Sequence, residues 1–344
     1  MEYQYNHLIP QNIAPKSAKS IGVYRGGKKI CNISLGNLTP PTKTKLYSFG
    51  LISDMHMSDY RLASSTKFDN VLSYFEEQDA LFCCHSGDIS DYGFWKPIST
   101  GVSAYNPVAF EEYQRVTQNH SIPVYGCCGN HESQNGYDIV GTYTDTQGSN
   151  PSLVVNNLQK LQEYTGKGLY FTVTQGNDVF VFVGQPNMSK PMNDEAFSWL
   201  CQTLEANQTK RCFVFVHPQI SSGSPLGVYD INDKFRDWSH LTEFKNLLNQ
   251  YTNVILFHGH SHTRFECQEL DENANYSTKD GFKSVHVPSL GLPRKVVSGE
   301  LIDLTEESQG YLVDVYEDCI VLNGMDFIYN KPVPLGTYKI DTTG

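Results

Sequence analysis

Two kinds of segment that would place this chain in or across a membrane are absent from its sequence. No run of residues approaches the roughly 18 consecutive apolar side chains of a membrane-spanning helix. The first residues, Met1 to Asn6, include no positively charged segment followed by an apolar core, as a secretory signal would. These absences predict a soluble protein that resides in the cytoplasm and has no membrane partner.

Positive charge is also scarce. The 344 residues contain 26 Lys and Arg against 37 Asp and Glu, which gives a formal net charge of -11. Proteins that bind nucleic acid through a broad surface concentrate Lys and Arg there, so no such surface is expected. A small-molecule phosphoester remains compatible with this charge, because a local metal site can attract phosphate.

The nine cysteines form neither a CxxC pair nor a disulfide framework. Their number is odd, and two pairs are adjacent, Cys83-Cys84 and Cys127-Cys128. We therefore expect reduced thiols, which again favours the cytoplasm. Buried free cysteine commonly behaves as a small hydrophobic residue, so a thiolate contribution to a metal site is the less favoured interpretation of these pairs.

Three parts of the chain differ in pattern. Residues 1–44 contain two short apolar runs around Arg25-Gly26-Gly27-Lys28, which predict a β-hairpin followed by a linker. An isolated hairpin is marginal in water, so it is expected to pack on the main domain or on a protein partner. Residues 45–330 are expected to form the main domain, and residues 331–344 a C-terminal tail.

Within the main domain, apolar runs alternate with helical patterns. Strands are expected at 46–52, 80–84, 122–128, 212–216 and 254–257, and helices at 68–77, 107–119, 150–164, 194–207 and 241–250. This alternation predicts an α/β protein with parallel strands. A hairpin is expected around Gly176, and three later strands, at 283–287, 311–316 and 319–325, indicate a second, mixed sheet. The polar stretches 133–150 and 221–238 are expected to be loops beside the substrate.

Polar side chains of similar kind follow five of the predicted strands. In chain order they are Asp54 and His56, Asp88 and Asp91, Asn130 and His131, His217, and His260 and His262. Each segment alone is weak evidence for a functional site, since Gly-Asp is common in turns after a strand and a single histidine is more often structural. The carboxyl ends of parallel strands share one edge of a sheet, so together the five segments predict one site.

Histidine, carboxylate and amide side chains are mixed nitrogen and oxygen ligands. They suit divalent ions of Mn, Fe, Zn or Ni rather than calcium or a thiolate zinc site. In Asp54-x-His56 and His260-x-His262, the spacing of an extended segment would point both side chains to one side. Seven candidate ligands are too many for one ion that also binds substrate. The sequence therefore predicts two ions that share a carboxylate, an arrangement suited to displacement at phosphorus.

The ordered set of five segments resembles the signature of the calcineurin-like metallophosphoesterase superfamily, over roughly residues 46–262. The resemblance implies a four-layer αββα sandwich with two mixed β-sheets flanked by helices, and an enzyme that hydrolyses phosphoesters. It implies Asp54, His56 and His262 as ligands of one ion, Asn130, His217 and His260 as ligands of the other, and Asp88 as the bridge. It also implies catalytic roles for His131, as general acid, and for Asp91, as the carboxylate that orients His131.

Three positions depart from particular branches of that superfamily. Tyr92 stands where protein Ser/Thr phosphatases have Arg, and Asp91 stands where purple acid phosphatases have a metal-binding Tyr. Glu132 replaces the commoner Asp after Asn-His, a replacement that we expect to be tolerated. His217-Pro218 and the unbroken Asp54-x-His56 segment resemble bacterial phosphodiesterases more than either phosphatase branch.

We therefore expect hydrolysis of a phosphodiester by a hydroxide held between two metal ions, with His131 protonating the leaving oxygen. Two alternatives stay open. One is a phosphomonoesterase or nucleotidase, and the other is a non-catalytic scaffold that docks to a larger assembly through the N-terminal hairpin. The sequence fixes neither the metal nor the substrate.

Overall fold

The computed structural model describes residues 20–25, 28–34, 41, 43–92, 95–99, 102–132, 159–185, 192–220, 240–298 and 300–342. The loops expected at 133–150 and 221–238 lie outside these residues. The predicted N-terminal hairpin is confirmed, because β1 (Ser20–Arg25) and β2 (Lys28–Ser34) pair antiparallel as a separate two-stranded sheet. Two further hairpins pair β5 (Trp95–Ser99) with β6 (Val102–Tyr105) and β14 (Arg294–Val297) with β15 (Glu300–Asp303).

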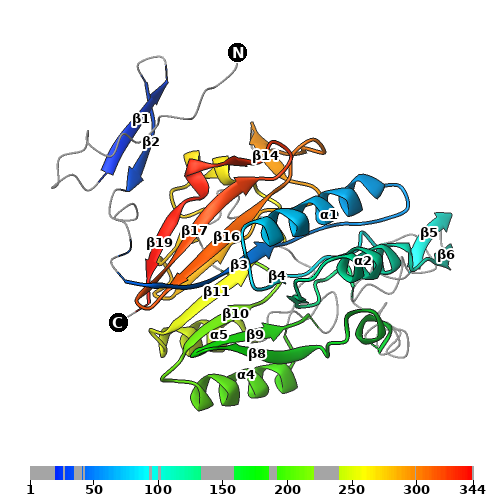
Figure 1. Cartoon of the computed structure of the whole chain (residues 1–344), viewed down its shortest axis with the longest axis horizontal. Helices are drawn as coiled ribbons and strands as arrows, with labels where there is room; N and C mark the ends of the chain where they lie inside the picture. Colours follow the sequence, from blue (N-terminus) through cyan, green and yellow to red (C-terminus); the bar gives the residue numbers. More distant parts are fainter. Residues whose placement is uncertain are drawn as a thin grey trace.

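Two large mixed sheets lie face to face (Figure 1). The seven-stranded sheet has the order β18-β17-β16-β3-β4-β7, with β19 paired to β17. Its strands are β3 (Lys45–Ile52), β4 (Cys83–His85), β7 (Val124–Gly126), β16 (Gln309–Tyr316), β17 (Cys319–Asp326), β18 (Lys331–Pro332) and β19 (Tyr338–Asp341). The six-stranded sheet has the order β12-β13-β11-β10-β9-β8. Its strands are β8 (Tyr170–Gln175), β9 (Asp178–Val183), β10 (Arg211–Phe215), β11 (Val254–His258), β12 (Tyr276–Ser277) and β13 (Lys283–His286).

Helices cover the outer face of each sheet, which gives four layers (Figure 1). On the seven-stranded sheet these are α1 (Leu62–Glu77) and α2 (Val108–Asn119), and on the six-stranded sheet α4 (Asp194–Ala206) and α5 (Leu241–Asn249). Residues 159–165 are helical too, and the short 3-10 helices are η2 (Phe265–Glu269) and η3 (Pro334–Gly336). The predicted four-layer α/β fold is confirmed. Within the described residues, no helix combines the length and the apolar character needed to cross a membrane.

The alternation of residue types in β9 shows how the sequence builds these layers. Phe180 and Phe182 point into the core between the two sheets, whereas Val179, Val181 and Val183 pack with the helices outside. Side chains of a strand point alternately to opposite faces, so a strand that is buried on both faces has no polar position. The sheet thus presents aromatic rings to the other sheet and small branched side chains to its helices.

Two boundaries differ from those expected. Helix α1 begins at Leu62, six residues before the expected start, because it opens on the small polar run Ser64-Ser65-Thr66 after an exposed Leu62. The expected tail, residues 331–344, includes β18 and β19, both paired with β17, so the sheet extends through residue 341. Pro332, Pro334 and Gly336 interrupt this stretch and conceal its short strands. The division of the chain into domains stays a prediction.

A buried ion pair in the six-stranded sheet is hydrogen-bonded to the seven-stranded sheet, at the ends opposite the predicted site. Arg211 donates from Nε and Nη2 to the two carboxylate oxygens of Asp178, at 2.9 and 2.6 Å. Tyr47 of the other sheet donates to Asp178 Oδ2 at 2.5 Å, and Arg211 also donates to the carbonyl oxygen of Tyr316. This network fixes β3, β9, β10 and β16 relative to one another.

Replacing Arg211 by Met should lower the free energy of unfolding by about 3–5 kcal/mol, because it leaves the Asp178 carboxylate buried without its cation. Urea denaturation followed by circular dichroism measures the change. Lys45→Met is the matched control, since the Lys45–Asp314 pair has a lysine side chain that is 47% exposed. The control should cost less than about 1 kcal/mol. Equal losses in the two variants would contradict a role for the buried pair.

A second contact links α1 to the end of α2. The Glu76 carboxylate accepts hydrogen bonds from Ser121 N and Oγ at 2.5 and 2.7 Å and lies 2.9 Å from His120 Nδ1. These contacts, first of all the one with His120, lower the pKa of Glu76 from 4.5 to about 2.

A lowered pKa in the folded state means that the ionised carboxylate stabilises the fold above pH 4.5 and that this stabilisation is lost as pH falls toward 2. Glu76→Gln removes the titrating group. Denaturant unfolding at several pH values should therefore show a gap between wild type and variant that is full near pH 6 and narrows below pH 4.5. A gap of constant size over this range would count against the assignment.

Candidate metal centre

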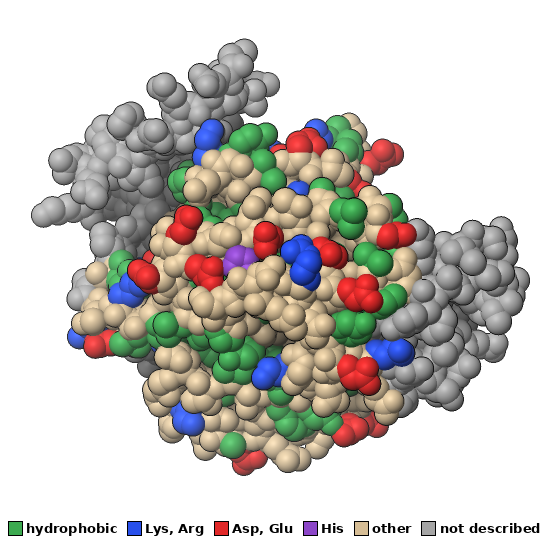
Figure 2. All heavy atoms as spheres, turned by 45° about the vertical axis from the view of Figure 1, so that its right-hand side comes forward, with side chains coloured by type: hydrophobic (Ala, Val, Ile, Leu, Met, Phe, Trp, Pro, Cys, Tyr) green, Lys and Arg blue, Asp and Glu red, His purple; other side chains and the backbone are tan. Residues whose placement is uncertain are grey.

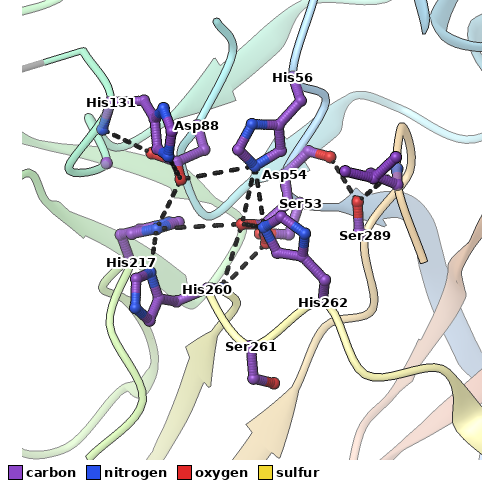
Figure 3. Close-up of polar contacts among 12 residues, drawn as sticks. Ser53, Asp54, His56, Asp88, His131, His217, His260, Ser261, His262 and Ser289 are labelled. Carbon is purple, nitrogen blue, oxygen red and sulfur yellow. Dashed lines mark hydrogen bonds and ion pairs between the residues drawn. The ribbon is translucent and has the colours of Figure 1, made fainter. Parts of the chain in front are cut away.

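The carboxyl ends of five strands converge at one edge of the sandwich. Strands β3, β4 and β7 are parallel neighbours in one sheet, and β10 and β11 are parallel neighbours in the other. The two sets end side by side, so the segments that follow them meet. Figure 3 shows the side chains of these segments pointing toward one another, among them Asp54, His56, Asp88, His131, His217, His260 and His262.

Asp88 lies at the middle of this cluster. Its Oδ2 atom is buried and receives no hydrogen bond from the described residues. It faces three imidazole nitrogens, with His217 Nε2 at 3.1 Å, His56 Nε2 at 3.7 Å and His131 Nε2 at 3.8 Å. A buried carboxylate oxygen surrounded by ring nitrogens in this way fits a cation better than it fits the protein groups alone.

Asp54, His56 and His262 form a tight group on one side of Asp88. His262 Nε2 lies 3.1 Å from Asp54 Oδ1, and the Nε2 atoms of His56 and His262 are 2.8 Å apart. His56 uses its Nδ1 atom on the Asp91 carboxylate at 3.1 Å, so its Nε2 is the atom directed into the cluster. Two imidazoles that direct nitrogen atoms at one point, beside a carboxylate, suit a transition-metal ion.

Two groups of possible ligand atoms share Asp88. One contains Asp54, His56, Asp88 and His262, the other contains Asp88, His217 and His260, and within each group the atoms lie within 4.8 Å of one another. Asn130, the remaining expected ligand, is buried next to His131 in the segment that follows β7. The residues present therefore fit a dinuclear metal site. The role of each residue as a ligand stays a prediction.

The backbone at these ligands differs from the extended segments expected. Asp54, His56, Asp88, His260 and His262 adopt the left-handed conformation, with φ between 48° and 73°. They are five of the eight non-glycine residues with positive φ among those described. Such residues cost about 1–3 kcal/mol each and persist where the surroundings hold them. The paired side chains thus face inward because their turns are left-handed, and not because the chain is extended.

The structure also changes the expected role of Asp91. Its carboxylate was expected to orient His131, but it contacts His56 Nδ1 at 3.1 Å, Arg61 Nη1 at 2.6 Å and the hydroxyl of Tyr60. His131 Nδ1 is hydrogen-bonded instead to the backbone carbonyl oxygen of Asp91. The side chain of Asp91 therefore positions a predicted metal ligand, while its main chain holds the predicted general acid.

Glu132 contributes to the site in a way that the sequence analysis missed. Its buried carboxylate accepts hydrogen bonds from the backbone nitrogens of Asp88, Ser90 and Gly129, at 2.9, 3.0 and 2.8 Å. One side chain therefore ties the loop after β4 to the loop after β7. The approach is so close that a Cβ atom at Gly129 would lie 2.1 Å from Asp88 Oδ1. The signal available in the sequence was an acidic residue directly after His131, in a segment expected to lie at the site.

Burial and the facing imidazoles set the charges of the centre. Burial opposes ionisation of both Asp54 and Asp88. His262 and His217 nevertheless lower the pKa of Asp54 well below its ordinary value, and chiefly His217 and His131 do the same for Asp88. Both carboxylates are therefore negative at neutral pH. Burial lowers the pKa of His131 to about 4, although the Asp88 carboxylate 3.8 Å away opposes this, so its ring is neutral at pH 7.

The cysteines do not take part in the cluster. The cysteines whose side chains the structure describes, which are all except Cys31, are free thiols, and burial raises the pKa of Cys83, Cys84, Cys127 and Cys128. A thiol with a raised pKa is a poor metal ligand at neutral pH. These residues act as small apolar side chains of the core.

Comparison with known proteins connects this geometry to a family. A model of the calcineurin-like phosphoesterases matches residues 47–264. No curated protein sequence matches significantly. A dimetal phosphatase structure from Danio rerio is similar with a TM-score of 0.56 and 13% identity, over 87% of this chain and 100% of that one. A purple acid phosphatase from yellow lupin (Lupinus luteus) seeds is similar with a TM-score of 0.54 and 11% identity, over 88% of this chain and 55% of that one. At these identities the structural likeness shows the fold alone.

Substituting Asp88 and His131 should separate the predicted bridge from the predicted general acid. Asp88→Asn should lose bound metal, because it removes the carboxylate that both groups share. His131→Ala should keep its metal content and lower turnover by about 10²- to 10⁴-fold, the usual contribution of a general acid. Elemental analysis of the purified variants, together with phosphoester assays, measures both effects. Equal loss of metal in the two variants would contradict this division of roles.

Proposed function

This chain belongs to the calcineurin-like phosphoesterase family and is a metal-dependent phosphoesterase, and within this class we propose that it is a phosphodiesterase with two metal ions. The observation that carries the proposal is the pair of ligand groups that share Asp88. Asp54, His56 and His262 would hold one ion, and Asn130, His217 and His260 the other. Ions of Mn, Fe, Zn or Ni suit these side chains. When bound, they would activate water and neutralise charge on the phosphoryl oxygens.

The chain itself supplies the proton donor that we propose for the leaving group. His131 donates from Nδ1 to the carbonyl oxygen of Asp91, which leaves Nε2 directed toward Asp88 and the centre. A negatively charged phosphoester beside this ring would raise its pKa and favour protonation at Nε2. That proton can then pass to the leaving oxygen. Asp91 acts on the other side, where its carboxylate holds His56 by Nδ1.

The pairing of nearby cations supports a diester rather than a monoester as substrate. Two arginines border the centre in the part of the chain that the structure describes. Arg61 is paired with Asp91 at 2.6 Å, and Arg294, next to His262, is paired with Asp303 at 2.7 Å. A monoester carries close to two negative charges at neutral pH, and a diester carries one. Neither guanidinium is free to take up the second charge.

The exposed surface supports a small-molecule substrate. On the face shown in Figure 2, a histidine side chain is exposed near the middle of the view with acidic side chains beside it, and the Lys and Arg side chains are scattered over the coloured part. This distribution favours a small phosphoester over nucleic acid bound along a broad surface. A protein partner at the N-terminal hairpin and a cytoplasmic location stay predictions.

The test compares bis-p-nitrophenyl phosphate with p-nitrophenyl phosphate, in the presence of Mn, Zn, Fe and Ni supplied one at a time. A phosphodiesterase should show a kcat/KM at least about tenfold higher for the diester, a difference of about 1.4 kcal/mol in transition-state binding. His131→Ala, prepared in parallel, is the control for contaminating phosphatases. A preference for the monoester would replace the proposal by a phosphomonoesterase or nucleotidase. Metal binding without any hydrolysis would favour a scaffold.

A further inference from the structure

Lys67 is a buried cation that the proposed chemistry does not use. It lies on α1 with 6% of its surface exposed. Its Nζ atom donates to the carbonyl oxygens of Gly291 and Glu307, at 2.8 and 2.6 Å. Burial lowers its pKa to about 8, and Asp326, Glu306 and Glu307 oppose this by their charge. Burying an ammonium group in this way is costly, so its two contacts call for an explanation.

The loop that Lys67 contacts packs against the backbone of a predicted metal ligand. The Asp54 carbonyl oxygen accepts hydrogen bonds from Ser289 Oγ at 2.7 Å and from Gly291 N at 3.1 Å, and Figure 3 shows Ser289 beside Asp54. Leu290 N donates to the neighbouring Ser53 carbonyl oxygen at 2.8 Å. The fit is close, since a Cβ atom at Gly291 would lie 1.9 Å from the carbonyl oxygen of Met55.

The same loop reaches a second ligand of the same ion. A few residues beyond Gly291, Arg294 N donates to the carbonyl oxygen of His262 at 2.7 Å. The loop 289–294 therefore holds the main chain of both Asp54 and His262. Both residues are in the left-handed conformation, which needs outside contacts to persist.

We propose that Lys67 is a positioning residue for the metal ion of Asp54, His56 and His262, and this rests on the dinuclear site proposed above. Lys67 holds Gly291 by its carbonyl oxygen, and Gly291 holds Asp54 by its backbone nitrogen. Without the ammonium group, two carbonyl oxygens inside the protein lose their donor and the loop is freed from α1. Asp54 and His262 then lose the contacts that keep their side chains aimed at the ion. The loop reaches the ligands of the second ion less directly, since His260 N donates to the Asp54 carboxylate at 3.0 Å, so the ion of His217 and His260 should depend on it less.

The experiment uses the full chain, stripped of metal by a chelator and titrated with Mn²⁺ by isothermal titration calorimetry. Lys67→Met should weaken one of the two binding events about tenfold or more, the usual effect of removing a group that orients a ligand, and should change the other less than threefold. Lys67→Arg keeps the charge and the donors, so it should restore most of the affinity.

Val71→Ala is the matched control for general destabilisation. Val71 is fully buried on the same helix and packs in the core outside the sheet. The control should lower the melting temperature and leave both Mn²⁺ affinities unchanged. If Lys67→Met also leaves both affinities unchanged, or if Val71→Ala weakens Mn²⁺ binding equally, Lys67 is only structural.

Ser289→Ala tests the same loop without removing a buried charge, and so remains informative if Lys67→Met does not fold. It should weaken the same binding event, and unchanged binding would overturn the proposal. Binding is measured without substrate, so two bound ions without diester hydrolysis would refute the phosphodiesterase and leave the role of Lys67 standing. A wild-type chain that binds no Mn²⁺ would refute both.

Discussion

The contact between the Asp88 carboxylate and the His217 ring joins the predicted ligands of one sheet to those of the other. The carboxylate comes from the end of β4, and it faces His217 from the end of β10 in the opposite sheet. The two sheets are held together by aromatic rings such as Phe49 and Phe180, whose centroids are 5.2 Å apart in an edge-to-face contact. That rigid packing fixes the distance between the strand ends. The chemistry of the centre therefore depends on the spacing of an apolar core.

Much of the fold could be predicted from the sequence because its pattern is local. The run Val179 to Val183 is apolar throughout, and such a run reads as a strand that is buried on both faces. The polar residues after the strands could be grouped for the same reason, since parallel strands end at a common edge. The short strands β18 and β19 lacked such a pattern, because Pro332 and Pro334 interrupt it.

What the sequence did not reveal are contacts between loops that are far apart along the chain. Asp91 was expected to face His131, but whether a side chain or a carbonyl oxygen reaches a ring depends on the turn that carries it. Glu132 was counted as a tolerated replacement, although its carboxylate joins two loops. The left-handed turns at the ligands were also invisible, since Asp and His are found in many conformations. These features depend on tertiary contacts that no local pattern records.

The loops that carry the predicted metal ligands are held in place by hydrogen bonds within the protein. The Glu132 carboxylate accepts hydrogen bonds from three backbone nitrogens, and Ser289 donates a hydrogen bond to the carbonyl oxygen of Asp54. A zinc finger, by contrast, folds only around its metal, so its metal affinity and its stability are one quantity. In this chain the two quantities are separable. A site of this kind would receive different divalent ions without a change in the architecture around it.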